Sequence, residues 1–456
     1  MRNWVLKFYH LLYLFTTGMI VVGPAWYNRY PLMYFDSGAY MEMAVNLEPS
    51  YHRALGYPLL IKFTGLHISN WPLILIQGLL ISYLIYRYVD VFAPRATRYV
   101  WHFTSVVLLS FFSSVSWYAA QLMPDVWTLI SVLSLGLIVL DRAANWKRLS
   151  AYSIISYFGL LTHLSHIPML LLLLITLLGA RTVTRYQQVI QKKALLIWSV
   201  LLLASFLTIS SFNAVHGFGF RISLASNAFI TANLGEMGVL KMYLDEQCGQ
   251  QTLILCPWKD KLPRETYGYL WDPNGPVNQH PEGWAGANDA MAPIVHDFLT
   301  QPRYLKWFLF AAVKSTLQQM AQIELGSGLQ YAYGEGSPPY WPMKEHFKQE
   351  LNEYLTSVQN KGDALPLPFF RWMNYISLML SILVLGRAVL YRHLSAELAL
   401  LLLLFLAAYF FNASITGVLA NVYERLQCRL LPLIQFLAIL VFLIGRKDQE
   451  HATEED

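Results

Sequence analysis

The sequence predicts an all-α polytopic membrane protein with about 10–11 transmembrane helices and one large segment outside the membrane. Its 456 residues are 55% hydrophobic and only 13% charged, and the mean hydropathy is +0.38. These values are displaced from those of a soluble domain. Apolar runs of nearly the roughly 20 residues needed to cross the hydrocarbon recur along the chain. Basic residues flank these runs in an alternating pattern, which is typical of a multi-pass membrane protein.

The expected spans follow the apolar runs in chain order. Eight runs cover residues 8–26, 71–91, 100–118, 124–141, 194–212, 371–390, 395–411 and 427–445. A ninth run, 151–180, is too long for one crossing and carries His163 and His166 at its middle. Because basic residues flank both ends of this run, we interpret it as a hairpin of two spans.

The short basic loops predict the orientation. Alternation from a cytoplasmic N-terminus places all of these loops in the cytoplasm, as the positive-inside rule requires. Their basic residues include Arg87, Arg95, Arg98, Arg142, Lys147, Arg148, Arg181, Arg185, Lys192, Lys193 and Arg387. The same alternation leaves residues 27–70, 119–123, 163–168, 213–370 and 412–426 outside. Both termini are therefore expected in the cytoplasm.

We expect three parts in the chain. Residues 1–212 form an N-terminal transmembrane module whose first outer loop is 27–70, residues 213–370 form an outer loop region with interfacial helices, and residues 371–456 form a C-terminal transmembrane module. In the outer region, the run 302–320 is an interfacial helix, a partial span or an eleventh crossing. A polar helix is expected over about 343–359.

The three cysteines are too few for a disulfide scaffold. Cys248 and Cys256 lie close together in the outer region and can pair in an oxidising compartment. Cys428 is left over inside an expected span.

The first outer loop contains the clearest polar pattern. A helix over 36–47 would place Asp36, Tyr40 and Ala44 on one stripe, and it would direct Glu42 away from Asp36. We expect this helix to lie flat on the outer membrane surface. Pro49 and Pro58 prevent one continuous helix through the loop.

These residues resemble the GT-C superfamily of membrane glycosyltransferases, in particular the bacterial members akin to protein mannosyltransferases and the lipid A aminoarabinose transferase. The similar features are Asp36, Tyr40, Ala44 and the run Arg53, Gly56, Tyr57, Pro58, Leu59 in the first outer loop, Met123-Pro124-Asp125, PRYLKWF (302–308) and YERLQCRLLPL (423–433). Relatives often carry a pair of acidic residues in the first loop, whereas Ser37 and Gly38 follow Asp36 here. No cofactor is therefore expected, since a paired acidic motif for a divalent metal is missing.

The resemblance implies an enzyme of the bacterial inner membrane with a periplasmic active site. Its donor would be a polyprenyl-phosphate-linked sugar, and its acceptor a hydroxyl of a glycan, of lipopolysaccharide or of a protein. Asp36 would be the general base, with a pKa raised by partial desolvation. Arg53, Arg425 and Arg429 would hold the donor phosphate, although Arg425 and Arg429 compete for one family position. Further substrate-binding candidates are Tyr40, His52, Tyr57, Asp125, His163, His166, Arg221 and Lys241.

Each candidate also has a purely structural interpretation. Asp36 is a suitable N-cap, the arginines suit snorkelling to lipid headgroups, and Asp125 after Pro124 suits any helix start. His163 and His166 suit a polar turn better than a metal or haem site.

Two other functions remain open. A transporter or lipid-linked sugar flippase would be expected to have internally symmetric halves and broken or charged mid-span helices. A lipid-linked ligase or polymerase would be expected to use late-loop arginines and a histidine without the Asp36 helix. The net charge of +5 is attributed to membrane orientation rather than to nucleic-acid binding.

Overall fold

A computed structural model describes residues 2–65, 68–362, 364–391 and 394–454. In the first 215 residues the helices are α1 Arg2–Val21, α2 Gly23–Asn28, α3 Ser37–Asn46, α4 Gly56–Gly65, α5 Trp71–Phe92, α6 Arg98–Phe112, α7 Val115–Ala119, α8 Asp125–Leu140, α9 Trp146–Thr162, α10 His166–Ala180, α11 Thr184–Gln187 and α12 Lys192–Val215. Beyond them lie α13 Ser226–Glu236, α14 Val239–Gln247, α15 Thr266–Leu270, α16 Gly283–Thr300, α17 Pro302–Met320, α18 Tyr340–His346, α19 Leu351–Leu355, α20 Leu367–Leu390, α21 Ala396–Leu419, α22 Glu424–Cys428 and α23 Leu431–Glu454. The only β-pairing among the described residues is an isolated bridge between Leu32 and Gln121.

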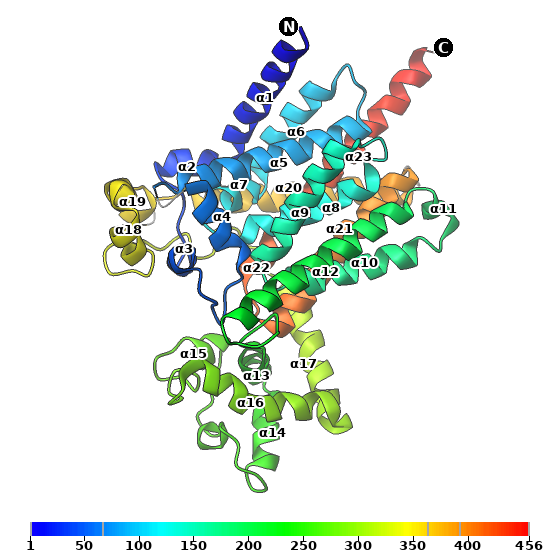
Figure 1. The fold of residues 1–456 in the computed structure, drawn as a ribbon. Coiled ribbons are helices and arrows are strands. Elements are labelled where there is room, and N and C mark those ends of the chain that lie inside the picture. Colours follow the sequence, from blue (N-terminus) through cyan, green and yellow to red (C-terminus); the bar gives the residue numbers. More distant parts are fainter. Residues whose placement is uncertain (1, 66–67, 363, 392–393, 455–456) are drawn as a thin grey trace.

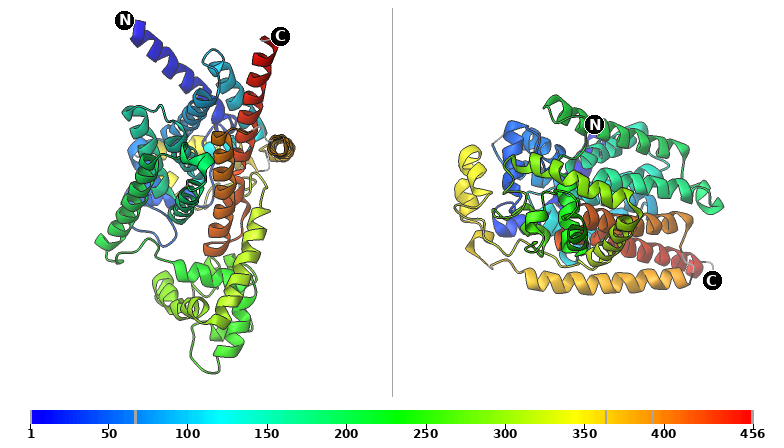
Figure 2. Two further views of the ribbon diagram at one scale, coloured as in Figure 1. Left: turned by 90° about the vertical axis from the view of Figure 1, so that its right-hand side faces the viewer. Right: turned by 90° about the horizontal axis from the view of Figure 1, so that it is seen from below.

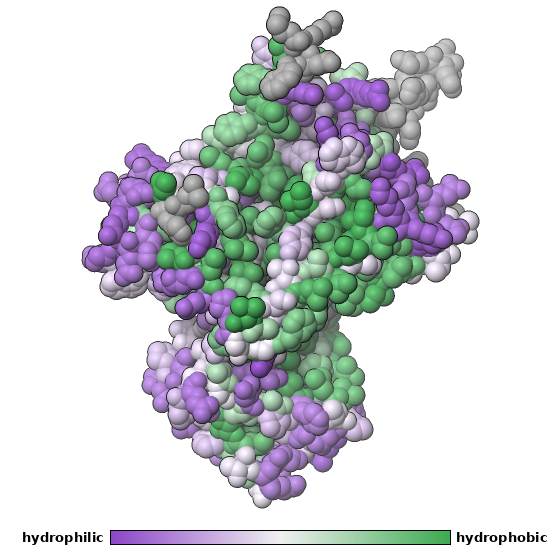
Figure 3. Space-filling view, viewed as in Figure 1, coloured by the Kyte–Doolittle hydropathy of each residue, from purple (hydrophilic) through white to green (hydrophobic). Residues whose placement is uncertain are grey.

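The protein is an all-α polytopic membrane protein. Each of the ten expected crossings contains a helix, and five helical segments are long and apolar enough to cross a membrane: Trp71–Phe92, Lys192–Val215, Leu367–Leu390, Ala396–Leu419 and Glu424–Leu443. Shorter apolar helices are Val5–Val21, Asp125–Leu140 and His166–Ala180. Apolar side chains cover the surface between polar side chains at α11 and polar side chains at α18 and α19 (Figure 3).

The chain termini and the helices α13 to α16 lie at opposite ends of the bundle (Figure 1). Both chain termini lie at the top of the bundle in Figure 1, whereas α13 to α16 lie below it and α18 and α19 lie at its left. The long run 151–180 is the expected hairpin, with α9 and α10 joined by a turn at 163–165. The basic segments before and after that hairpin are in contact: Arg142 Nη1 donates a hydrogen bond to the Gln188 carbonyl oxygen at 3.3 Å.

Two expected helices are interrupted. The run 100–118 was expected to be one span, but α6 ends at Phe112, because Ser113 is extended and Ser114 donates to the Cys428 carbonyl at 2.8 Å. The expected helix 343–359 was also wrong: α18 and α19 are separate short helices with a 3₁₀ turn, Lys348–Glu350, between them.

The C-terminal segments differ from expectation in a way that matters for the site. α21 continues to Leu419, through the first half of the expected outer loop 412–426. The expected span 427–445 is broken between α22 and α23, just before Pro432. Pro432 has no backbone N–H with which to continue the helical hydrogen bonding across the break, and it lies in the first turn of α23, where proline is well suited. Arg429 lies at this break, as the residue directly after α22.

The outer segment 213–370 packs in two parts. Residues of α13 to α17 form a hydrophobic core of their own, with buried members from Ala228 to Ala311. Residues from Leu325 to Leu367 pack instead against the core of the membrane helices. Figure 2 shows α13 to α16 projecting from the bundle, with α17 leading back to it.

Buried polar contacts fix the second part to the first outer loop. Glu350 accepts hydrogen bonds from Tyr30 at 2.7 Å and from the Asn70 backbone N–H at 3.0 Å. Gln359 accepts from the Met33 backbone N–H at 2.9 Å. The helix α3 is consequently covered, since α18 packs on it. A Cβ on Gly38 would lie 2.4 Å from the Pro338 carbonyl oxygen. The α3 helix therefore lies under α18, and its expected position along the outer membrane surface stays a prediction.

The run 302–320 forms the α17 helix, which has one packed face and one exposed apolar face. It is one 19-residue helix that packs along α21, and the Tyr409 hydroxyl donates to the Met320 carbonyl at 2.6 Å. Its other face exposes Leu309, Phe310, Val313 and Leu317. It is long enough to be a candidate span, but it is not among the five helices that are also sufficiently apolar.

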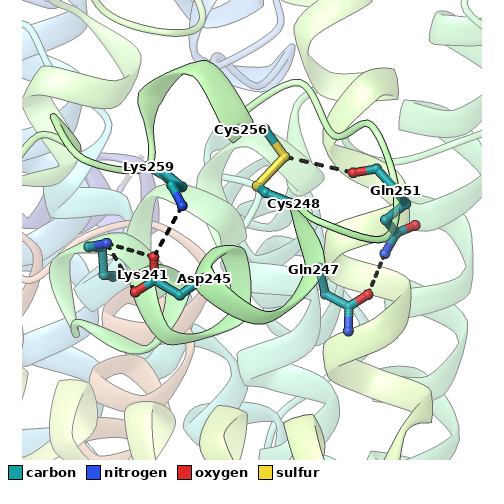
Figure 4. Close-up of a disulfide and its surroundings, with 7 residues drawn as sticks. All are labelled: Lys241, Asp245, Gln247, Cys248, Gln251, Cys256 and Lys259. Carbon is teal, nitrogen blue, oxygen red and sulfur yellow. Dashed lines mark hydrogen bonds and ion pairs between the residues drawn. A yellow bond between two sulfur atoms is a disulfide. The ribbon is translucent and has the colours of Figure 1, made fainter.

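Cys248 and Cys256 form a disulfide, as the sequence allowed, while Cys428 is buried and free. The disulfide joins two residues eight positions apart in the sequence, after α14 and beside the Lys241–Asp245 ion pair (Figure 4). Such a bond persists in an oxidising environment.

Removing this disulfide is expected to loosen the projecting part. For so short a loop, the double substitution Cys248→Ser/Cys256→Ser should lower the unfolding free energy by about 2–3 kcal/mol. Thermal unfolding in detergent would measure the change. The control is Cys428→Ser, which replaces the free cysteine and leaves the disulfide in place. Three reactive thiols in the denatured wild-type protein would contradict the disulfide.

Candidate functional site

The site is built around Asp36, which lies at the start of α3. Asp36 occupies the N-cap position, yet its side chain makes no capping hydrogen bond. The carboxylate instead forms ion pairs with Arg53 and with Arg425, whose Nη2 lies 3.1 Å from Asp36 Oδ2. The capping interpretation therefore does not account for this carboxylate.

Close helix packing positions Arg53. It precedes α4, and a Cβ on Gly56 at the start of that helix would lie 2.4 Å from the Leu161 carbonyl carbon. Only glycine permits this approach of α4 to the end of α9. Arg53 is thereby held beside Asp36, and its Nη1 also donates to the His52 carbonyl at 3.0 Å.

Arg425 connects the beginning and the end of the chain. Besides Asp36, it reaches Asp125 at the start of α8, with an Nη1 to Oδ2 distance of 3.4 Å. Arg429 pairs with the other oxygen of Asp125 at 3.1 Å and donates to the Asn412 side chain at 3.1 Å. Both candidate arginines thus belong to one network, and Arg425 is the one that contacts Asp36.

The network carries an excess of positive charge. Three guanidinium groups, of Arg53, Arg425 and Arg429, face two carboxylates, of Asp36 and Asp125. If all five groups are ionised, one positive charge is left uncompensated. The Nε donors of all three arginines are buried and have no hydrogen-bond partner. Buried donors without partners are costly, so the cluster has both the charge and the free donors to accept an anion.

Aromatic side chains surround these charges. The Arg425 guanidinium lies 4.2 Å from the centre of the Tyr34 ring, and Arg53 lies 5.4 Å from the centre of the Tyr40 ring. The Tyr34 hydroxyl donates to the Tyr423 hydroxyl at 3.0 Å. Tyr57 is buried beneath Tyr40, at 5.3 Å between ring centres. These rings exclude water from the ion pairs and favour the guanidinium groups through cation–π contacts.

His52 connects the site to the projecting part. Its ring lies 4.9 Å from Trp271 and 5.5 Å from Trp284, centre to centre. Burial, together with the positive charge of Arg53, lowers the pKa of His52 to about 3. The ring is therefore neutral at physiological pH, and its buried Nδ1 has no hydrogen-bond partner.

The pKa of Asp36 departs from expectation. Burial alone would raise this pKa, but the positive charges of Arg53 and Arg425 outweigh burial and hold the pKa below its ordinary value. The expected upward shift was wrong, because desolvation was considered without the two guanidinium groups. Asp36 is ionised in the state described.

The two histidines of the hairpin differ from each other. His166 is fully buried, with its Nε2 2.8 Å from the Thr128 hydroxyl and its Nδ1 2.7 Å from the Gly159 carbonyl oxygen. Both ring nitrogens of His166 therefore have hydrogen-bond partners within the core, as expected of a structural residue. His163 is partly exposed, and its Nδ1 lies 2.7 Å from the Ser165 hydroxyl. Within the described chain, no group of three or more His, Cys, Asp or Glu side chains suits a metal ion.

Two of the expected residues take no part in the cluster. Lys241 pairs with Asp245 at 2.7 Å (Figure 4) and with Asp260 at 3.2 Å, and all three side chains are exposed. Arg221 lies in the exposed stretch after α12. Among the described residues, neither side chain forms a hydrogen bond or an ion pair with the Asp36 network, so both lie apart from the cluster.

The sequence analysis missed Tyr34, Asn412 and Tyr423. Tyr34 and Tyr423 carried no pattern that separates them from other interfacial aromatics. Asn412 did carry a signal, because an amide within or beside an apolar span is costly unless it has a partner.

No protein-family model matches this chain, and no curated protein or solved structure matches it either.

Proposed function

We propose that the protein is a glycosyltransferase that moves a sugar from a polyprenyl-phosphate donor to an acceptor hydroxyl. The observation that carries the proposal is the Asp36 carboxylate held by Arg53 and Arg425 in a buried cluster with three unpartnered guanidinium donors. Guanidinium groups bind phosphate oxygens through paired, charge-assisted hydrogen bonds. The resemblance of the first outer loop to GT-C enzymes supports the same assignment.

The proposed reaction needs a base and an anion site next to each other. The acceptor oxygen attacks the anomeric carbon and passes its proton to the Asp36 carboxylate. The bond between the anomeric carbon and the phosphate oxygen breaks, and its electron pair stays on the phosphate. Negative charge grows on that phosphate, where Arg53, Arg425 and Arg429 would stabilise it.

Donor binding would also prepare the base. A phosphate that engages Arg53 or Arg425 competes with Asp36 for the same guanidinium groups. The attraction that lowers the pKa of Asp36 is then weaker, and the carboxylate becomes a better proton acceptor.

The proposed location is the periplasmic face of a bacterial inner membrane. The Cys248–Cys256 disulfide and the basic loops at the opposite end of the bundle support an outward-facing site. A donor embedded in the bilayer would reach the cluster from the lipid, which fits a chain in which no nucleotide-binding motif is evident.

A panel of donors tests this function. Purified protein should be stabilised by polyprenyl-phosphate sugars and should transfer their sugar to a suitable acceptor extract, whereas nucleotide sugars should do neither. Thermal shift and product analysis by mass spectrometry provide the two measurements. Stabilisation and turnover by a nucleotide sugar alone would exclude the proposed donor class.

The pH dependence gives an independent prediction. The pKa of Asp36 is below its ordinary value and that of His52 is about 3 in the substrate-free protein. We therefore expect kcat/KM, which reports the free enzyme, to show no ionisation of either group between about pH 5 and 8. Because the pKa of Asp36 is lower in the folded than in the unfolded state, its ion pairs contribute stability above about pH 4, and this contribution is lost as the pH falls through the folded-state pKa. An acidic limb near pH 6 that disappears in His52→Gln would contradict this prediction.

A further inference from the structure

A second candidate site lies between the N-terminal ends of α9 and α12, next to the basic loops that precede these helices. A groove of about 440 Å³ runs between the two helices, a volume within the range of about 300–1,000 Å³ common for small-ligand sites. It is lined by Trp146, Leu149, Ser150 and Ile154 of α9, and by Lys193 and Ile197 of α12, among others.

The groove combines a polar mouth with apolar walls. Ser150 of α9 and Lys193 of α12 lie in the first two turns of their helices. One helical turn further on, Ile154 follows Ser150 and Ile197 follows Lys193, each by four residues. Apolar side chains continue along α12 beyond the groove, where Val200 is 55% and Leu203 58% exposed. A ligand that fits this order has a charged head and an apolar tail.

The sequence that forms both helices of the groove carries charged side chains of one sign only, although Asp141, just before this sequence, pairs with Arg148. Residues 142–235 contain no aspartate or glutamate, whereas Lys147, Lys192 and Lys193 are among the basic residues near the groove. None of these three lysines forms an ion pair with another described residue. Both α9 and α12 begin at this end, so the positive ends of two helix dipoles add to the lysine charges.

We propose that this groove binds an anionic phospholipid from the adjacent leaflet. Its phosphate would lie against Lys193 and the Ser150 hydroxyl, and its acyl chains against Ile154, Ile197 and the exposed face of α12. Basic pockets between membrane helices on the cytoplasmic side bind anionic headgroups through this combination of charge and apolar surface. The site is independent of the proposed sugar transfer.

Lipid retention by the full-length protein tests the proposal. The protein in mild detergent is incubated with equal amounts of phosphatidylglycerol and phosphatidylcholine, and bound lipid is counted by native mass spectrometry. We expect preferential, saturable retention of phosphatidylglycerol. Lys193→Ala should lower it about fivefold, whereas Lys192→Ala, which removes the same charge one residue outside the groove lining, should change it less than twofold.

A second variant and a competitor complete the test. Ser150→Trp should fill the groove and reduce retention, and circular dichroism with monodisperse elution would establish that the variant is folded; if it is not, the comparison of the two lysine variants decides. Equal retention of the two lipids, or equal loss in Lys192→Ala and Lys193→Ala, would overturn the proposal. Displacement of the lipid by an equal concentration of inorganic phosphate would also overturn it, because the apolar walls would then contribute nothing.

Discussion

Replacing Asp36 with asparagine is expected to reduce sugar transfer by a factor of about 10²–10⁴, the usual contribution of a positioned general base. The amide cannot accept the acceptor proton, but it keeps the size of the carboxylate. Arg53 and Arg425 lose their shared anionic partner in this variant. Donor affinity should therefore be retained or increased while kcat falls, and measuring both in one donor titration separates the two effects.

Glu42→Gln is the matched control for this variant. It removes one carboxylate from the same helix, but Glu42 is exposed and accepts a hydrogen bond from Asn46 at 3.0 Å rather than from an arginine. We expect its transfer rate to stay within about twofold of the wild-type rate. Full activity in Asp36→Asn would show that this carboxylate is not the base.

Replacing Arg429 with methionine is expected to destabilise the protein by about 3–5 kcal/mol, because it removes the closer of the two guanidinium partners of the buried Asp125 carboxylate. Arg429 is 1% exposed and Asp125 is equally buried. Asp125 would retain only the longer contact to Arg425, at 3.4 Å. Asn412 would lose a charged donor as well. Thermal unfolding in detergent should show the loss directly.

Arg142→Met is the control for the stability effect. It breaks the Arg142–Glu397 ion pair of 3.2 Å, which is partly exposed, and should cost at most about 1 kcal/mol. The double substitution Asp125→Leu/Arg429→Met should recover part of the loss, since the protein then no longer buries a carboxylate that has lost its closer partner. A double variant less stable than the sum of the single variants would contradict this explanation.

The helices were predictable because membrane crossing imposes a length and a hydropathy on each segment. The length of the run 151–180 and the basic residues at both of its ends were enough to predict two helices there, which are α9 and α10. The interruptions were harder, because Ser113 and Ser114 end α6 through hydrogen bonds whose partners include the distant Cys428 carbonyl. Local propensity contains no information on such a partner.

The sequence predicted which types of residue form the site, but not how these residues pair in space. Asp36 and Arg53 lie in one loop, so their pairing follows from local sequence once the loop folds back. Arg425 is 389 residues from Asp36, and its position depends on α21 continuing to Leu419 and on the break before α23. The resemblance suggested these residues together, but the direction of the Asp36 pKa shift required the two ion pairs, which spacing along the chain does not reveal.

Product analysis in sealed proteoliposomes tests the central proposal most directly. A polyprenyl-phosphate sugar is placed in the membrane with an acceptor on one side, and released polyprenyl phosphate, glycosylated acceptor and translocated donor are measured together. We predict equal amounts of polyprenyl phosphate and glycosylated acceptor, and loss of both products in Asp36→Asn. Movement of intact donor across the membrane without cleavage of its sugar–phosphate bond would contradict the proposal and identify a transporter instead.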